Sequence, residues 1–183
     1  MNRAWLSLSC LIALGLTMTN PARSYAQNPP MGAMTGHAHA PATPSTGLAL
    51  SIDGKVTTLS VADLQAMPQK TVTVHNEHTK KDETYTGVEL AGLMARYGAP
   101  FDKAGEKKIF HSYVRVEGTD HYFVLYSGAE VQSEIHNADV LVAIAVDGKP
   151  LGEDGQIKLV ASGDKRPARW VRNLSAITLV TVK

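Results

Sequence analysis

Residues 140–160 read VLVAIAVDGKPLGEDGQIKLV, and this stretch decides the fold class. Val140–Val146 is an uninterrupted apolar run of the length of one strand, which is typical of a strand buried in a sheet. Asp147-Gly148 favours a tight turn directly after it. Because Ile157–Ala161 is a second β-prone run, the stretch predicts two strands of a sheet.

Further strands and short helices are expected before and after this stretch. Asp53-Gly54, between two β-prone runs in Leu48–Leu59, is a strong signal of a type I′ hairpin. Ser60 is expected to cap a short helix that Pro68 ends. The other expected elements are a strand at Thr71–His75, a charged turn at Thr79–Glu83, a capping box at Thr86–Glu89 with a helix to Tyr97, a hairpin at Ile109–Tyr126, a short helix from Ser127 to about His136, and a strand at Ala176–Val182. Because strands dominate, we predict an α+β fold with a mixed or antiparallel β-sheet and short helices.

The N-terminus has the pattern of an export signal. Arg3 supplies a positive start, and the apolar run Ala4–Met18 is shorter than the roughly 20 residues that a membrane-spanning helix needs. Ser24 and Ala26 are small residues at the positions that precede a cleavage site. We therefore predict a signal peptide at residues 1–26, a periplasmic or secreted location, and no stable membrane insertion after cleavage. The alternative is a retained N-terminal anchor.

The rest of the chain divides into a linker and one domain. Residues 27–47 are uncharged and rich in proline, glycine and alanine, so we predict a flexible linker there and a folded domain at 48–183. The single cysteine, Cys10, lies in the predicted signal, which excludes a disulfide framework or a cysteine-rich metal site in the domain. A formal net charge of +1 gives no reason to expect nucleic acid as a partner.

The common catalytic motifs are absent from the sequence. No GxSxG elbow is present, and Ser127 is better explained as a helix cap. No glycine-rich loop joins a predicted strand to a predicted helix, which argues against a nucleotide site. We therefore predict no catalytic residue, and two features remain as candidates for function: the histidines and a basic C-terminal segment.

Among the histidines, His75 and His78 are the candidate metal ligands. Successive side chains of a strand point to opposite faces, so these two converge only where the strand ends near Asn76 and the chain turns. A third ligand would have to come from His111 or His136. The alternative is that these histidines make ordinary hydrogen bonds on the surface or in the core.

The segment Lys158–Arg172 reads KLVASGDKRPARWVR and is the most basic part of the chain. Guanidinium groups bind phosphates and carboxylates through two parallel hydrogen bonds, which suits a loop of this kind to a small anionic ligand. The alternative is a solvated basic loop with Trp170 in the core. The candidate binding residues are Lys165, Arg166, Arg169 and Arg172.

From about Leu48 to Val182 the chain resembles the molybdopterin-binding domain of the sulfite oxidase family, in the form of small exported bacterial proteins. The resemblance depends on the order of five stretches, which are LSIDGKV at 50–56, VADLQAMPQKTVTV at 61–74, YTGVELAGLMARYGAP at 85–100, the stretch at 140–160, and DKRPARWVRNLSAITL at 164–179. It implies a mixed α+β domain and, in the active enzymes, a molybdenum–pterin cofactor with an anionic phosphate tail.

The resemblance also implies a cysteine ligand to molybdenum just after the strand that matches Thr71–Val74. Here the sequence has His75-Asn76-Glu77-His78 instead, and these are harder ligands than a thiolate. We therefore predict an exported relative of the molybdopterin-binding domain that binds a small anionic ligand or cofactor without sulfite oxidase-type redox activity. The alternatives are a periplasmic oxidoreductase that uses a pterin or a His-bound metal, and a domain that docks on a periplasmic redox partner.

Overall fold

The computed structural model of this chain describes residues 43–77, 79–101 and 105–182. The predicted signal peptide, most of the predicted linker and His78 lie outside the described residues. Within the described part, the structure holds no helix with the length and apolar character needed to cross a membrane.

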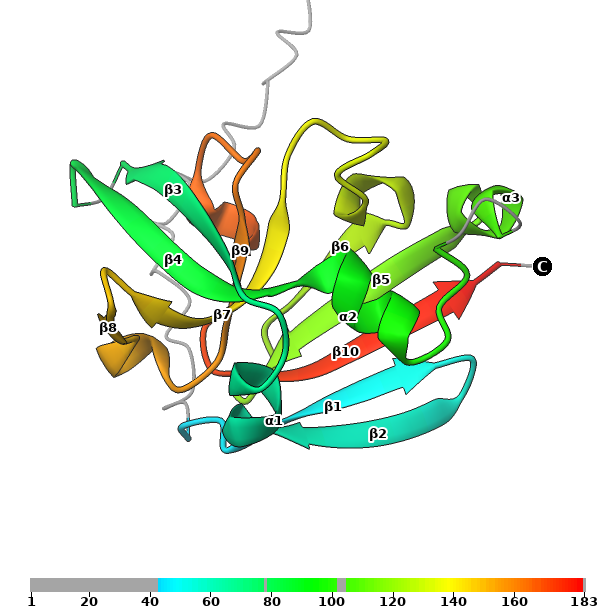
Figure 1. The fold of residues 1–183 in the computed structure, drawn as a ribbon, viewed down its shortest axis with the longest axis horizontal. Coiled ribbons are helices and arrows are strands. Elements are labelled where there is room, and N and C mark those ends of the chain that lie inside the picture. The colour runs from blue at the N-terminus through cyan, green and yellow to red at the C-terminus, as the bar shows by residue number, and fades with distance from the viewer. Residues whose placement is uncertain (1–42, 78, 102–104, 183) are drawn as a thin grey trace, which may run out of the picture. The chain divides into compact units, whose positions relative to one another are not determined.

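Two five-stranded sheets form the domain (Figure 1). The first sheet has the order β2-β1-β10-β5-β6, and its strands are β1 (Gly47–Ile52), β2 (Lys55–Ser60), β5 (Ser112–Gly118), β6 (Phe123–Ser127) and β10 (Leu174–Thr181). The central strands β1 and β10 are parallel, while every other pairing in this sheet is antiparallel. The last strand of the chain therefore lies between the first and the fifth.

The second sheet is antiparallel throughout and contains the stretch that decides the fold class. Its strands are β3 (Lys70–Asn76), β4 (Lys81–Glu89), β7 (Val140–Val146), β8 (Lys149–Pro150) and β9 (Lys158–Ala161). On one side β7 pairs with β4, and on the other side it pairs with β9 along its first half and with β8 at its end. The first four residues of β7, Val140–Ala143, are all buried, so both faces of the strand are covered there, which explains its apolar sequence.

Short helices connect the strands. Among the described residues, three are α-helical, namely α1 (Val61–Gln65), α2 (Leu90–Arg96) and α3 (Glu106–Phe110), and three are single 3₁₀ turns, namely η1 (Ala129–Val131), η2 (Gly152–Asp154) and η3 (Pro167–Arg169). Buried residues of both sheets and of α1 and α2 form one continuous apolar core, in which Tyr126, Met94 and Trp170 are among the large members.

Most predicted elements are confirmed. Strands dominate in a mixed α+β arrangement, as expected. Asp53 and Gly54 both have positive φ values, 49° and 80°, and Asp147 and Gly148 have 49° and 71°. Positive φ at both central residues is the requirement of a type I′ turn, so the two Asp-Gly pairs form the predicted turns. Ser60 and Asp63 cap α1 reciprocally.

Several local predictions are wrong. The charged turn expected at Thr79–Glu83 ends earlier, because β4 already begins at Lys81. Thr86–Glu89 forms no capping box but ends β4, and the Glu89 carboxylate is instead engaged by Lys70 and Ser133. Ile109 lies in α3 rather than in a strand. Ser127 and Glu130 do exchange the expected capping hydrogen bonds, but only one 3₁₀ turn follows them instead of a helix to His136.

The hairpin of β5 and β6 turns through residues 119–122, and Phe123 lies opposite Glu117 in its ladder. His121 lies in the turn with φ +62°, and its Nδ1 is still 3.3 Å from Glu117 Oε1. His121 therefore contacts Glu117 from the turn and not from a paired position of the strand.

Candidate functional site

The basic segment begins with β9 and continues through η3, and Trp170 anchors it. The Trp170 Nε1–H donates to the Ala161 carbonyl at 3.0 Å, and the indole ring meets the Tyr85 ring edge-on at 5.7 Å. This buried side chain fixes the end of η3 against β4 and β9, and it fulfils the expectation that Trp170 lies in the core. The cations on either side of it project from a rigid support.

Arg169 uses its guanidinium group inside the domain. Its Nη2 and Nε contact both oxygens of Asp164 at 2.5 and 3.1 Å, and its Nη1 contacts Glu130 Oε1 at 2.9 Å. The guanidinium also lies over the Tyr126 ring, 4.5 Å from its centroid. Hydrogen bonding to Asp164, more than any other cause, raises the pKa of Arg169 above its ordinary value. Two carboxylates thus already neutralise this cation.

The loop that carries Arg169 is held by backbone contacts as well. The Tyr126 hydroxyl donates to the Arg169 carbonyl at 2.7 Å, and the Tyr122 hydroxyl donates to the Ala168 carbonyl at 2.5 Å. Both tyrosines belong to the second hairpin of the first sheet. Together with the Arg169 ion pairs, they fix η3 to the rest of the domain.

Lys165, Arg166 and Arg172 are exposed, in contrast to Arg169. Among the described residues, neither Lys165 nor Arg166 forms an ion pair, and Arg172 Nε is 3.9 Å from Asp154 Oδ1 with 60% of its side chain exposed. That carboxylate is already held by Lys158 at 2.6 Å. These three cations are therefore the part of the segment that can meet a ligand.

A buried cation lies beneath this surface. Lys158 is the first residue of β9, and only 7% of its side chain is exposed. Its Nζ donates to Asp154 Oδ2 at 2.6 Å and to the Tyr85 hydroxyl at 3.0 Å, and it lies over the rings of Tyr85 and Trp170. These contacts neutralise and enclose the charge, as a buried ammonium requires.

The network continues from Tyr85 to the hairpin between β3 and β4. The Tyr85 hydroxyl donates to Glu83 at 2.7 Å, and Asn76 and Thr79 donate to the same carboxylate. Burial raises the pKa of Tyr85, and the carboxylate of Glu83 raises it further. Burial opposes ionisation of Glu83, but the hydrogen bonds it accepts outweigh burial and lower its pKa.

The β3–β4 hairpin contacts the basic segment through Tyr85, whose ring meets that of Trp170 at 5.7 Å and whose hydroxyl accepts from Lys158 Nζ at 3.0 Å. A hydrogen bond from Lys80 is the main cause that lowers the pKa of Glu77, and the positive charge of Arg166 contributes. Tyr85 thus joins the hairpin to Lys158 and Trp170, the buried part of the basic segment.

His75 lies near the tip of this hairpin, at the end of β3. Its Nδ1 is 2.8 Å from Asp82 Oδ1, and half of the histidine side chain is exposed. Within the described residues, no three potential metal ligands lie together. The structure therefore shows a carboxylate–histidine pair, and the role of His78 lies outside the described residues.

The donors at this end do not fit molybdenum as the resemblance implies it. The place that would carry the thiolate ligand holds His75, whose Nδ1 is engaged by Asp82. The sequence has no cysteine other than Cys10. Imidazole and carboxylate groups cannot supply the soft sulfur ligand.

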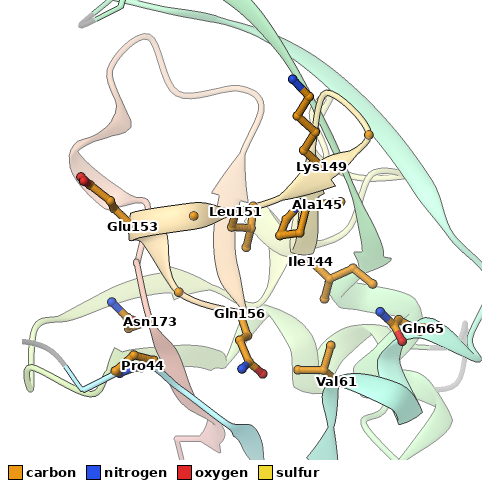
Figure 2. Close-up of a pocket in the computed structure, with 14 residues that line it drawn as sticks. Pro44, Val61, Gln65, Ile144, Ala145, Lys149, Leu151, Glu153, Gln156 and Asn173 are labelled. Carbon is orange, nitrogen blue, oxygen red and sulfur yellow. The ribbon is translucent and has the colours of Figure 1, made fainter.

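A cavity lies elsewhere, where the β7–β8 hairpin and η2 face α1 (Figure 2). Its volume is about 650 Å³, and Val61, Ile144 and Leu151 provide part of its apolar wall. The amides of Gln65, Gln156 and Asn173 also line it. Smaller hollows of about 360 and 190 Å³ lie beside α2. Among the described residues, none of the candidate metal or anion ligands lines these three cavities, whereas Arg169 and His136 line a fourth one of about 10 Å³.

Comparisons with known proteins show a likeness in fold. No family model matches the chain, and no curated protein matches it. Among solved structures, the chain is similar to the sulfane dehydrogenase SoxCD from Paracoccus pantotrophus, with a TM-score of 0.56 and 18% identity over 73% of this chain. The match covers 37% of that chain. At this identity the likeness is one of fold.

The sequence missed the residues that neutralise Arg169 and Lys158. Asp164 directly precedes the Lys165-Arg166 pair, and an acidic residue at that place was a usable signal. Glu130 and Tyr85 gave no such signal, because Glu130 lies 39 positions from Arg169 and Tyr85 lies 73 positions from Lys158 in the sequence. Only the fold brings them there.

Proposed function

We propose that this protein is an exported relative of the molybdopterin-binding domain that binds a small oxyanion, without sulfite oxidase-type redox activity. The binding surface consists of Lys165, Arg166 and Arg172, beside the tip of the β3–β4 hairpin. The observation that carries the proposal is that the cations of the basic segment have two different surroundings. Arg169 is neutralised by Asp164 and Glu130 and fixes the loop, while three exposed cations remain on it.

The chemistry of these cations suits a phosphate or a carboxylate. A guanidinium group offers a planar fork of donors to two oxygens of such an anion, and an ammonium adds a mobile donor. A loop that is already ordered loses less conformational entropy when it binds than a mobile one does. Trp170 and Arg169 supply that order here. The expected ligand is therefore small and carries an anionic oxygen group.

The proposal excludes oxygen-atom transfer of the sulfite oxidase type because of the donor chemistry at the hairpin. His75 with its partner Asp82 takes the place of the sulfur ligand. A change from thiolate to imidazole alters the affinity and the electronic properties of a bound metal. Purified protein should therefore oxidise no sulfite, even where the cells can make the cofactor.

Calorimetric titration with inorganic phosphate tests the binding surface. The double variant Lys165→Ala, Arg166→Ala should weaken binding at least about tenfold, which corresponds to the roughly 1.4 kcal/mol expected for lost charge-assisted hydrogen bonds. Lys149→Ala is the matched control, because this exposed lysine belongs to β8 and not to the basic segment. Phosphate binding that survives the double variant, or that is absent from the wild type, contradicts the proposal.

A second candidate function is metal binding at His75. The observation that favours it is the Asp82 contact at Nδ1, since a carboxylate on one ring nitrogen is the usual support for a histidine that binds a metal through the other. Metal analysis of protein purified from its native compartment tests this function. Stoichiometric copper, zinc or iron that is lost in His75→Ala supports it, and a metal content below one-tenth of an ion per chain contradicts it.

A further inference from the structure

The last strand of the first sheet, β6, leaves one of its edges open. It pairs with β5 only, with Arg115 opposite Leu125 and Glu117 opposite Phe123. The opposed residues at both ends of this ladder are hydrogen-bonded, because Gly118 N–H donates to the Tyr122 carbonyl and Gly128 N–H donates to the Ser112 carbonyl. These bonds fix which residues of β6 face β5 and which face outward.

Antiparallel pairs alternate between hydrogen-bonded and non-bonded positions. Counting inward from both ends, Val124 and Tyr126 occupy bonded positions, while Phe123 and Leu125 occupy non-bonded ones. The backbone N–H and C=O groups of Phe123 and Leu125 therefore point away from β5. In the part of the chain that the structure describes, no hydrogen bond satisfies these groups.

The side chains along this edge are exposed and apolar. About half of Phe123 (49%) and of Leu125 (50%) is exposed, on the face of the sheet that lies away from the core. Natural sheets protect open edges with lysine, proline, bulges or very short strands. Phe123–Ser127 reads FVLYS and carries none of these residues, and its register with β5 has no bulge.

The neighbouring charges do not repel a second strand. Arg115 lies over the Phe123 ring, with its Cζ 4.4 Å from the ring centroid, and donates to Glu117. His121 also contacts Glu117. These contacts neutralise the charges next to the open edge of β6. An uncharged strand that pairs with this edge therefore meets no net charge.

We propose that β6 binds β6 of a second copy of this chain, as an antiparallel pair about a two-fold axis at Val124. In this register Phe123 of each copy lies opposite Leu125 of the other. Each such pair exchanges both of its N–H···O=C bonds, so every free backbone group at these positions gains a partner. The exposed phenyl and isobutyl groups also become cross-strand neighbours, which contributes apolar contact. A two-fold axis requires a self-complementary segment, and Phe-Val-Leu meets this requirement.

The variant Leu125→Pro tests the backbone pairing directly. It removes an outward N–H that the domain does not use, and proline is tolerated at such positions of edge strands. Sedimentation velocity of the purified full chain should show a wild-type dimer, and Leu125→Pro should raise the dimer dissociation constant at least tenfold. Leu125→Lys, which adds charge without changing the backbone, should give the same shift and serves where the proline variant is unfolded by circular dichroism.

Val56→Lys is the matched control. Val56 is 62% exposed on β2, at the opposite edge of the same sheet. Its dimer should have the dissociation constant of the wild type. A wild-type protein that stays monomeric at a concentration of about 100 µM overturns the proposal, because a dimer with a weaker dissociation constant than this has no useful affinity. So does a dimer that survives in a folded Leu125 variant, or one that Val56→Lys weakens to the same extent.

Discussion

Two parts of one basic segment have opposite surroundings. Lys158 and Arg169 are enclosed by carboxylates and aromatic rings, while Lys165 and Arg166 lie in solvent between them in the sequence. All four contribute equally to the charge of the segment. The comparison teaches that local charge density predicts a basic surface but not which cations are available to a ligand. The enclosed cations should matter for stability and the exposed ones for binding.

Among the substitutions that test this contrast, we expect the largest effect on stability at Lys158. Lys158→Met removes the ammonium that Asp154 and the Tyr85 hydroxyl share, and we expect a loss of about 2 kcal/mol in the free energy of unfolding. The buried Tyr85 hydroxyl loses a donor, and Asp154, whose side chain is 27% exposed, loses its ion-pair partner. Urea unfolding at pH 7 measures it. Lys149→Met, at an exposed lysine, should stay within about 0.5 kcal/mol of the wild type. Equal effects at both positions contradict the contrast.

Arg169→Ala should have the second largest effect. It leaves Asp164 and Glu130 without their shared cation, but more than a third of the guanidinium side chain is exposed and solvent screens the loss. We therefore expect about 1.5 kcal/mol of destabilisation in the same urea experiment. Phosphate affinity should fall as well, since the loop is no longer fixed. Arg169→Lys should recover less than half of the stability, because an ammonium cannot bind both carboxylates in the same way.

The pH dependence of stability should sharpen the assignment of Arg169. Burial acts against ionisation of Glu130, but hydrogen bonds from Ser127 and Arg169 lower its pKa below the ordinary 4.5. A lowered folded-state pKa stabilises the fold above the unfolded pKa, and this contribution is lost as the pH falls through the folded pKa.

Wild-type stability should therefore decline from about pH 5 downward, and Arg169→Ala should show a shallower decline, by about 0.5 kcal/mol between pH 5 and 3.5. Urea unfolding across this range gives both slopes. Arg172→Ala is the control, because its guanidinium lies near Asp154 and not near Glu130. If the stability of Arg169→Ala declines with falling pH as steeply as that of the wild type, Arg169 does not lower the pKa of Glu130.

The smallest expected effect on stability is that of the exposed pair. Lys165→Ala with Arg166→Ala should change the free energy of unfolding by no more than about 0.5 kcal/mol, since neither side chain is buried or ion-paired among the described residues. The melting temperature should accordingly stay within a few degrees of the wild type. A large drop would show that these cations hold the loop, and it would remove the contrast with Arg169.

Local signals in the sequence predicted the elements well where the backbone itself imposes a rule. The two Asp-Gly turns, the Ser60 cap and the apolar strand β7 follow from φ preferences, capping chemistry and burial, which act over a few residues. The capping box expected at Thr86–Glu89 failed because the Glu89 carboxylate is bound by Lys70 and Ser133. Contacts with side chains far away in the sequence cannot be predicted from the residues next to Glu89.

The sequence by itself determined the α+β class, the basic character of Lys158–Arg172, and the absence of a cysteine in the predicted domain. The tertiary structure decided which cations are neutralised, that the β3–β4 hairpin lies near the basic segment, and that β6 presents an open edge. The physical reason is the range of the interactions. Turn and strand preferences act along the chain, whereas charge neutralisation and edge pairing depend on groups that only the fold brings together.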